Sequence, residues 1–292
     1  MPAASPARRF GSDHPREGTT SKTAIITGAT RGIGRATAVA LARRGYDLVV
    51  TGRTRHEGDS AALPEARAMP EVAVAPGSLD STVALIEAEG GRATPVVLDL
   101  LDAERLVPAA EEAIAALGHV DLLLNNAIYV GPGSTELFLD TAPDDIAKRV
   151  FGNVTAQLIF TQPVLRHMVG RGTGTIVGMT SAAGYEPPTR RAGEGGWAAV
   201  YGVSKAAFTR IAAQLAVEHP ELRFYNVQPG FVTTERVRAA GEKLAFVADR
   251  GAPVELIGEA TARILDAPPG TFANGATIEV QDLAREWGLL PG

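Results

Sequence analysis

Apolar residues along the chain follow two alternating patterns from Lys22 onward. Short unbroken apolar runs, such as residues 24–26, 48–50 and 122–124, alternate with longer segments in which apolar residues recur at helical spacing. Unbroken runs are typical of strands that are covered on both faces of a sheet. Strands are expected to begin near Thr23, Asp47, Thr94, Val120, Thr175, Arg223 and Thr277. The alternation predicts βαβ units, and hence an α/β fold with a parallel sheet.

Helices with clear ends are expected between these strands. Three of them cover residues 34–44, 79–89 and 103–117, and a glycine follows each one, as is common at helix C-termini. Pro108 removes one backbone hydrogen bond from the third helix and predicts a kink there. Residues 55–77 contain three prolines and predict a long insertion after the second strand, which we expect to decorate the surface.

Length and charge bound the class of protein. With 292 residues, of which 45% are hydrophobic, the chain is long enough for one large domain. The formal net charge of -5 creates no field that would draw in nucleic acid or anionic lipid. No apolar run approaches the ~18 residues that span a bilayer. A small-molecule partner is therefore expected, with no nucleic acid and no membrane.

The numbers and positions of cysteine and histidine residues exclude several kinds of catalytic and metal site. The chain has no cysteine, which excludes disulfides and thiolate catalysis and leaves the cytoplasm as the default compartment. The histidines are scattered, so no metal is expected. Residues 1–21 lack the apolar stretch of a secretory signal and predict a disordered N-terminal tail. Residues 22–292 are expected to form a single domain.

A glycine-rich turn joins the first strand to the first helix. Residues 27–34 read Thr-Gly-Ala-Thr-Arg-Gly-Ile-Gly, with glycines at 28, 32 and 34. Such glycines let the backbone turn tightly and approach a pyrophosphate, whose charge the helix N-terminus then meets. Glycines also mark ordinary turns, and it is the position between strand and helix that indicates dinucleotide binding.

The end of the second strand distinguishes the two nicotinamide cofactors. A carboxylate there would bind the ribose 2′-hydroxyl of NAD, whereas arginine accommodates the 2′-phosphate of NADP. The chain has Gly52-Arg53-Thr54 with no acid until Glu57, and Arg31 in the glycine-rich turn is within reach of the same phosphate. NADP(H) is therefore favoured over NAD(H). The alternative is that both arginines are merely solvated.

Further motifs follow in order along the chain. They are Asp99-Leu100, Asn125-Asn126-Ala127, Asn153, Ser181, Tyr201-Gly202-Val203-Ser204-Lys205, and Pro229-Gly230 followed by Thr234. With the glycine-rich turn, this series resembles the short-chain dehydrogenase/reductase family from about residue 23 to about residue 280. The resemblance implies a single Rossmann-type, doubly wound domain with an about seven-stranded parallel sheet and helices on both faces. It also implies a homodimer or homotetramer, and the insertion is similar to that of hydroxysteroid-dehydrogenase-like members.

Tyr201 and Lys205 have the chemistry that hydride transfer needs. Hydride delivery to a carbonyl leaves an alkoxide that needs a proton, and tyrosine is a suitable donor if its pKa falls from ~10 toward neutrality. Lys205 follows Tyr201 by one helical turn, so its ammonium is placed to stabilise the phenolate. We therefore expect an NADP(H)-dependent oxidoreductase that moves hydride between the cofactor and a carbonyl or secondary alcohol.

The resemblance assigns the remaining roles. It implies that Lys205 also holds the nicotinamide ribose, that Ser181 binds the substrate oxygen, and that Asn153 positions a proton-relaying water. Together with Tyr201, these three residues make a catalytic tetrad. Taken singly, each residue has an ordinary alternative, because a lone Ser or Asn is usually a cap or a turn. Cofactor contacts are implied at Gly28, Thr30, Arg31, Gly32, Ile33, Gly34, Arg53, Thr54, Asp99, Leu100, Asn126, Ala127, Tyr201, Lys205, Pro229, Gly230, Val232 and Thr234.

The spacing between Ser181 and Tyr201 departs from the family pattern. The two are twenty positions apart, several more than is usual, so residues 182–200 must bulge outward as a substrate loop. The loop contains Tyr185, Arg190, Arg191 and Trp197. We expect its two aromatic residues to contact apolar substrate, whereas the two arginines suit either an acidic substrate or solvent.

Three further features bear on the pocket. Residues 235–252 are expected to form a lid, in which Leu244 and Phe246 touch substrate. Ile128 stands where the family often has glycine, and its side chain would tighten the pocket or shift the loop. Residues 279–282 replace a common Gly-Gly ending, which leaves a C-terminal contact between subunits open.

Two other classes of protein compete with an enzyme of this family. A cofactor-sensing protein would bind NADP(H) on the same fold without catalysis, and it need not retain the tetrad. A serine hydrolase would pair Ser181 with a histidine, but no histidine lies in a recognisable motif. The sensor is therefore the alternative that stays open beside the enzyme.

Overall fold

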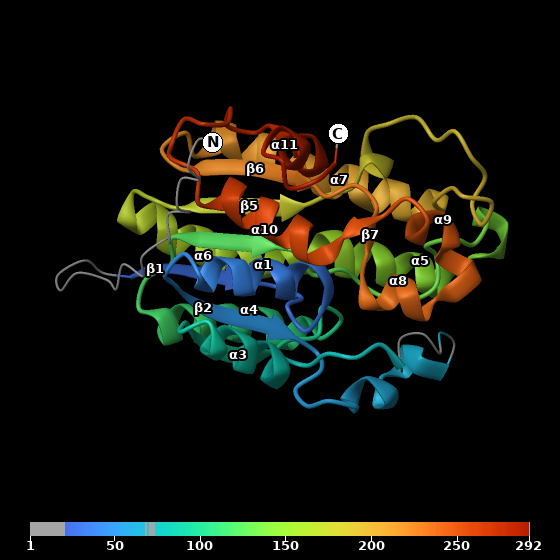
Figure 1. Ribbon diagram of the computed structural model, residues 1–292, viewed down its shortest axis with the longest axis horizontal. Coiled ribbons are helices and arrows are strands. Elements are labelled where there is room, and N and C mark those ends of the chain that lie inside the picture. The colour runs from blue at the N-terminus through green and yellow to red at the C-terminus, as the bar shows by residue number, and fades with distance from the viewer. Residues whose placement is uncertain (1–20, 68, 70–73, 292) are drawn as a thin grey trace, which may run out of the picture.

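A parallel sheet forms the centre of the molecule (Figure 1). The computed structural model describes residues 21–67, 69 and 74–291. Within these residues, seven parallel strands pair in the order β3-β2-β1-β4-β5-β6-β9. They are β1 Lys22–Ile26, β2 Tyr46–Gly52, β3 Arg92–Val97, β4 Leu122–Asn125, β5 Thr175–Met179, β6 Arg223–Gln228 and β9 Thr277–Glu279. Each begins within two residues of its expected start, and the α/β fold is confirmed.

Helices cover both faces of the sheet. They are α1 Gly32–Ala42, α3 Leu79–Ala88, α4 Ala103–Leu117, α6 Ala156–Arg171, α7 Ala199–Glu218, α10 Val254–Leu265 and α11 Val280–Glu286. Residues of α1, α10 and α11 share one core cluster with the sheet, and residues of α4 and α6 share another. α1 begins two residues earlier than expected, and α4 continues through Pro108.

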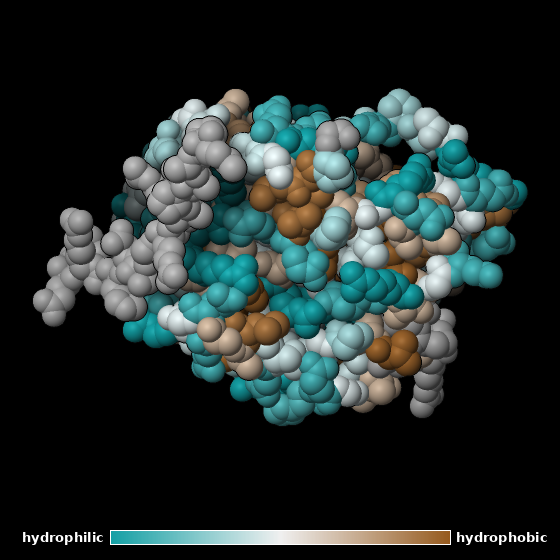
Figure 2. Space-filling view, in the orientation of Figure 1, coloured by the Kyte–Doolittle hydropathy of each residue, from teal (hydrophilic) through white to brown (hydrophobic). Residues whose placement is uncertain are grey.

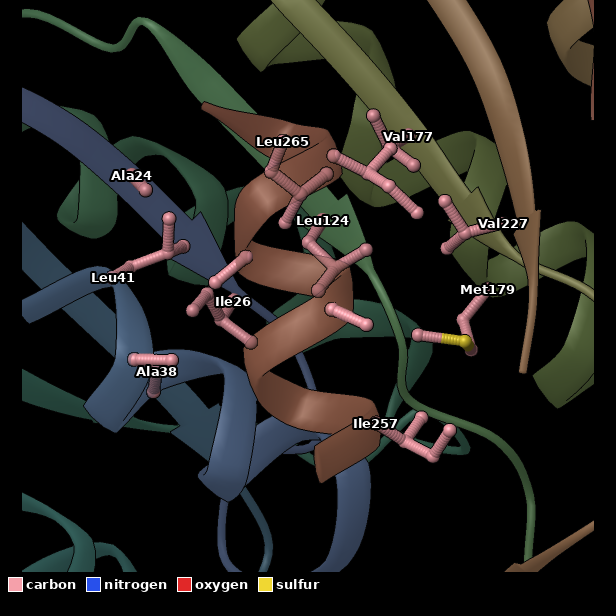
Figure 3. Close-up of a cluster of buried hydrophobic side chains, with 14 of the residues drawn as sticks. Ala24, Ile26, Ala38, Leu41, Leu124, Val177, Met179, Val227, Ile257 and Leu265 are labelled. Carbon is pink, nitrogen blue, oxygen red and sulfur yellow. The ribbon is translucent and has the colours of Figure 1, made fainter. Parts of the chain in front are cut away.

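The two core clusters explain the unbroken apolar runs. In β1, Ile25 belongs to the cluster with α4 and α6, and its neighbour Ile26 belongs to the cluster with α1 and α10. Both side chains are fully buried, because successive strand residues point to opposite faces and both faces are covered. Figure 3 shows side chains from β1, β4, β5 and β6 gathered around α10, which presents Ile257 and Leu265 to them.

The sheet order places a cleft at one edge. The strand order reverses between β1 and β4, and open α/β sheets bind their ligands at such a switch point, outside the carboxyl ends of the strands. The glycine-rich turn, the ends of β4 and β5, and the N-terminal half of α7 therefore meet at this edge.

Two short strands and three short helices border the same edge. β7 Val232–Thr233 pairs with β8 Ala252–Pro253, a second small sheet that the sequence pattern did not predict. Between them lie α8 Glu235–Ala239, η6 Gly241–Leu244 and α9 Ala245–Ala248, which form the segment expected as a lid. Figure 1 shows α8 and α9 at the end of the sheet to which the strand arrows point.

Further short elements complete the described chain. α5 Pro143–Val150 continues through a π-helical turn, η4 Phe151–Thr155, directly into α6. The 3-10 turns are η1 Asp59–Ala62, η2 Pro64–Arg67, η3 Phe138–Asp140 and η5 Ala182–Gly184. The predicted tail, apart from Ser21, and residues 68 and 70–73 of the insertion lie outside the described residues.

The surface of the described chain is mixed. No helix among the described residues is long and apolar enough to cross a membrane. On the face shown in Figure 2, apolar side chains occur in small patches that polar side chains separate.

Candidate active site

A cavity of about 820 Å³ opens at the carboxyl edge of the sheet. Its wall contains every residue predicted for catalysis or cofactor binding except Gly34 and Asn153. Residues from the first glycine-rich turn to the loop after β6, more than two hundred positions apart, are therefore brought together. The sheet topology does this, because the strands that precede these segments all end at the same edge.

The glycine-rich turn is held tightly against the loop after β4. Gly28 has φ of +67°, and a Cβ there would lie 2.7 Å from the Cα of Ala127. Asn126 Nδ2 donates to the carbonyls of Thr27 and Gly28 at 2.9 and 3.0 Å. A Cβ on Gly34 would overlap both Asn126 and Gly28. Gly34 is therefore required for packing behind the turn, and the structure does not place it in the cavity wall.

The N-terminus of α1 faces the cavity without a side-chain cap from Arg31. The amide of Gly32 donates to Glu235 Oε2 at 2.9 Å, and the other oxygen of this carboxylate pairs with Arg35. Glu235 is the first residue of the lid helix α8. The lid is thus attached directly to the start of the helix that is expected to meet a pyrophosphate.

Arg31 is engaged by the insertion. Its Nε donates to the carbonyl of Pro76 at 3.0 Å, and its Nη2 donates to that of Gly77 at 2.7 Å. Glu57 accepts from the amide of Gly77, and Leu63 lines the cavity. The expectation that the insertion merely decorates the surface is therefore wrong, because its described residues hold the glycine-rich turn and form part of the cavity wall.

Arg53 and Asp99 lie side by side at the ends of β2 and β3. Arg53 Nη1 is 3.8 Å from Asp99 Oδ2, and the Arg53 side chain is 17% exposed. Asp99 Oδ1 accepts from the amide of Leu101 at 2.9 Å, which fixes the carboxylate. This end of the cavity therefore offers both a guanidinium and a carboxylate, and Thr54 lines it too.

Tyr201 is buried in α7 at 9% exposure, and its backbone carbonyl accepts from Ser204 Oγ at 2.8 Å. Burial raises the pKa of Tyr201, while a hydrogen bond with Ser181 and the nearby guanidiniums of Arg236 and Arg149 oppose this shift without cancelling it. The sequence argument makes proton donation depend on a fall in the pKa of Tyr201, and the side chains around Tyr201 do not by themselves produce that fall. Desolvation of the phenolate is the cause.

Lys205 lies one turn further along α7 and is 4% exposed. Its Nζ donates to the carbonyl of Met179 at the end of β5, at 2.8 Å. Burial, and then the positive charges of Arg236 and Arg149, lower the pKa of Lys205 to about 7. At neutral pH only part of the Lys205 population therefore carries the ammonium charge that the sequence argument assigns to it.

Asn153 supports the site from behind. It lies in the π-helical turn η4, where its Oδ1 accepts from the amide of Tyr129 at 2.8 Å and its Nδ2 donates to Ser204 Oγ at 3.0 Å. Ser204 in turn donates to the carbonyl of Tyr201. Asn153 thus connects the loop after β4 to α7, and its side chain does not line the cavity.

The loop after β6 is fixed by the C-terminal part of the chain. Gln281 Nε2 donates to the carbonyls of Pro229 and Phe231 at 3.0 and 2.8 Å. Thr234 Oγ1 accepts from the amide of Val237 at 3.3 Å and so caps α8. The segment that replaces the family's common ending therefore positions the loop expected to bind the nicotinamide.

The substrate loop and lid differ in detail from expectation. Trp197 lines the cavity as expected, but Tyr185 does not, because its hydroxyl donates to Glu279. Arg190 lines the cavity at an exposed position. Neither Leu244 nor Phe246 lines it, and Phe246 packs behind Trp197, while Val247 reaches the wall.

Comparison with known proteins gives the family. A model described as short chain dehydrogenase matches residues 22–75 and 65–245. The chain belongs to the short-chain dehydrogenase family. An uncharacterized oxidoreductase of Mycobacterium tuberculosis is 31% identical over 270 residues, which are 89% of this chain and 90% of that protein. Gluconate 5-dehydrogenase of Gluconobacter oxydans is 29% identical over 88% of this chain and 92% of its own.

Solved structures agree with this assignment. The crystal structure of a short chain dehydrogenase from Mycobacterium paratuberculosis bound to NAD has a TM-score of 0.69 and 26% identity, over 91% of this chain and 98% of that one. The short-chain dehydrogenase described here is therefore an oxidoreductase on a fold that binds a nicotinamide cofactor.

Arg149 is the supporting residue of this dehydrogenase that the sequence did not indicate. It is fully buried, and its guanidinium donates to the carbonyls of Gly131 and Pro132, the latter at 2.8 Å, and more weakly to that of Tyr129 at 3.5 Å. Tyr129 and Val130 line the cavity. A single arginine after Lys148 in a charged helix is typical of a solvated face, so no signal in the pattern reveals this role.

Proposed function

We propose that the protein is an NADP(H)-dependent oxidoreductase that interconverts a carbonyl compound and a secondary alcohol. The observation that carries the proposal is that Tyr201, Ser181 and Lys205 line the same cavity as the glycine-rich turn. A hydride donor bound at that turn and a substrate oxygen bound by the hydroxyls of Tyr201 and Ser181 would then lie in the same cavity, partly shielded from water.

The residues of the cavity fit a dinucleotide. The amides in the first turn of α1 suit a pyrophosphate, which would take the place of the Glu235 carboxylate at Gly32, and Gly28 leaves room for its approach, since a side chain there would meet Ala127. Asp99 and Leu100 suit the adenine end, and Thr234 and the backbone near Val232 suit a carboxamide. Lys205 suits the ribose hydroxyls. When bound, the nicotinamide would supply or accept the hydride.

Tyr201 acts as the general acid in the reducing direction. The substrate oxygen accepts hydrogen bonds from the hydroxyls of Tyr201 and Ser181 while hydride reaches the carbonyl carbon. The raised pKa keeps Tyr201 protonated, so it holds the proton that the new alkoxide takes. The guanidiniums of Arg149 and Arg236 lie near enough to stabilise the phenolate that remains.

Lys205 returns the proton. With a pKa of about 7, it both carries and releases a proton at neutral pH, which is the property a relay needs. Asn153 fixes the position of α7 relative to the loop after β4 through its hydrogen bonds with Ser204 and Tyr129, so its role is to position these elements. A water held near Asn153 completes the path to solvent in this proposal.

NADP(H) is the proposed cofactor because Arg53 lies at the end of β2 with Thr54, where the 2′-phosphate would sit. Asp99 lies 3.8 Å from Arg53, and a relative of similar fold is described bound to NAD, so the choice calls for a direct test. Arg53→Ala is expected to weaken NADPH binding at least tenfold more than NADH binding. Arg55→Ala is the matched control, since Arg55 pairs with Asp80 outside the cavity wall. An unchanged preference in Arg53→Ala would defeat the assignment.

Catalysis is tested by following the absorbance of reduced nicotinamide with a panel of ketones. Tyr201→Phe is expected to lose at least 100-fold in kcat while still binding NADPH. Tyr225→Phe is the control, because Tyr225 is also buried but does not line the cavity. Binding of NADPH without turnover of any ketone or alcohol by the unaltered protein would favour the alternative, a cofactor sensor.

We place the protein in the cytoplasm as a homodimer or homotetramer. Equilibrium sedimentation tests the oligomeric state.

A further inference from the structure

An aromatic corner stands beside Tyr201 at the substrate end of the cavity. The ring centroid of Trp197 lies 4.8 Å from that of Tyr201, with the planes tilted by 34°. Phe246 meets Trp197 edge-on at 5.4 Å, and Phe231 meets Phe246 edge-on at 5.8 Å. Trp197 and Phe231 line the cavity, and Phe246 backs them from the lid. We call Trp197, Phe231 and Phe246 the aromatic corner.

The cavity wall holds buried apolar side chains as well as the aromatic corner. Val237 and Val247 line the cavity and are both buried. Pro187, Pro188, Glu186 and Arg190 also line it, but all four are exposed, so they belong to its rim. The faces of aromatic rings offer no conventional hydrogen-bond partner, and a hydroxyl pressed against them loses its bonds to water. A substrate with several hydroxyl groups therefore fits this corner poorly.

The backbone holds Trp197 in place. The amide of Ala198 donates to the carbonyl of Ser134 at 2.8 Å, and the amide of Gly196 donates to that of Arg191 at 3.1 Å. A Cβ at Gly196 would overlap the carbonyl of Arg190, so the turn before Trp197 requires glycine. The extra length of residues 182–200 thus ends in a tight turn that presents the indole to the cavity.

We infer that the substrate carries a flat apolar ring on its reacting carbonyl carbon, and that this ring packs into the aromatic corner. The inference rests on the proposed function. The rings of Trp197 and Tyr201 lie 4.8 Å apart between centroids, so with the substrate oxygen at the hydroxyl of Tyr201 a substituent on the same carbon can extend toward Trp197, and aromatic faces favour offset stacking with flat groups. In the reducing direction, hydride from NADPH bonds to the carbon and the proton of Tyr201 bonds to the oxygen. The ketone that carries the ring becomes a secondary alcohol, and NADPH becomes NADP⁺.

Matched ketones test the inference by activity. We expect kcat/KM for the flat-ring ketones acetophenone and 2-acetylnaphthalene to exceed that for acetoin and 2-butanone by roughly 10- to 100-fold, since a few apolar groups in a fitted pocket are worth that much. Trp197→Ala is expected to lower kcat/KM for the ring ketones at least tenfold, mainly through KM, and for 2-butanone less than threefold. Trp197→Phe should restore most of the difference. Equal losses for ring and chain ketones, or a preference for acetoin, would overturn the inference.

A binding measurement separates this inference from the proposed function. The chain has two tryptophans, so Trp287→Phe leaves Trp197 as the sole tryptophan fluorophore. Trp287 packs on Arg263 outside the cavity wall, and its replacement should not alter the ranking of ketones. With NADP⁺ present, acetophenone is expected to quench Trp197 saturably and acetoin is not. Quenching without turnover would refute the proposed function alone, whereas turnover of ketones without saturable quenching by acetophenone would refute the ring-binding corner alone.

Discussion

Replacing Arg149 by methionine tests whether a buried cation supports the active-site loop. Arg149 is fully buried and donates to the carbonyls of Gly131, Pro132 and, more weakly, Tyr129. Methionine fills much of the same volume but donates nothing. The substitution therefore isolates the hydrogen bonds from the packing.

The magnitude follows from the carbonyls left behind. A buried acceptor that loses its donor costs ~1–3 kcal/mol, and two carbonyls lose theirs fully. The substitution also removes the cost of burying a charged guanidinium, which offsets part of this loss of stability. The lowered pKa of Arg149 reflects that cost, because burial disfavours the charged form. We expect the free energy of unfolding to fall by about 3 kcal/mol, which for a domain of this size lowers Tm by roughly 5 °C.

Urea denaturation followed by circular dichroism measures this loss, and the slope with urea should stay constant if the native fold is kept. Lys148→Met is the matched control on the neighbouring residue. Lys148 pairs with Asp144 on an exposed helical face, where a single ion pair adds little to stability. Arg149→Met should also raise KM, because Tyr129 and Val130 line the cavity. If the two variants unfold within about 1 kcal/mol of each other, the supporting role assigned to Arg149 is refuted.

Three further predictions concern the lid, the loop after β6 and pH. Glu235→Gln keeps an acceptor for the amide of Gly32 but loses the ion pair with Arg35, so NADPH should dissociate about 3- to 10-fold faster in stopped flow, as expected for ~1 kcal/mol; an unchanged rate argues against a role of the lid in cofactor release. Gln281→Leu frees two carbonyls and should raise KM for NADPH while leaving the fold intact by circular dichroism; an unchanged KM contradicts that role. Burial lowers the pKa of Lys205 to about 7, whereas an unfolded lysine titrates near ~10.4, so unfolding takes up a proton between these values. The free energy of unfolding should therefore rise with pH from about 7 to 9.5, by up to ~1.4 kcal/mol per pH unit, and Lys205→Met should flatten this slope in urea melts at each pH; equal slopes in both proteins would refute it.

The sheet could be predicted from the sequence because one physical rule governs it. Residues covered on both faces must all be apolar, so β1, β2 and β4 appear as unbroken runs such as Leu122-Leu123-Leu124. β7 and β8 could not be predicted in this way, since each contributes only two residues and Pro253 occupies one of them. Their pairing depends on where α10 and the loop after β6 bring them, which is a tertiary effect.

Most residues proposed to bear chemistry could also be located from the sequence, because they lie just after a strand or in the first turns of a helix; Asn153, in a π-helical turn between α5 and α6, is the exception. Ser181 follows β5, and Tyr201 and Lys205 share one face of α7, so the topology alone brings them to the cavity. The orientation of loop side chains was not predictable. Tyr185 and Phe246 were expected to face substrate, but the first binds Glu279 and the second packs behind Trp197.

The effect of burial on the pKa of Tyr201 was not predictable from the sequence for the same reason. From the sequence, the spacing of Tyr201 and Lys205 puts a cation beside a phenol and predicts a lowered pKa. Folding adds burial, which raises the pKa of Tyr201 and lowers that of Lys205. Lys205 is therefore only partly protonated at neutral pH, and its positive charge stabilises the phenolate less than the spacing suggests. The positive field at the phenol comes instead from Arg149 and Arg236, which reach it from α5 and the lid. A spacing rule describes two side chains along one helix, whereas the proton affinity of Tyr201 depends on every element that closes over it.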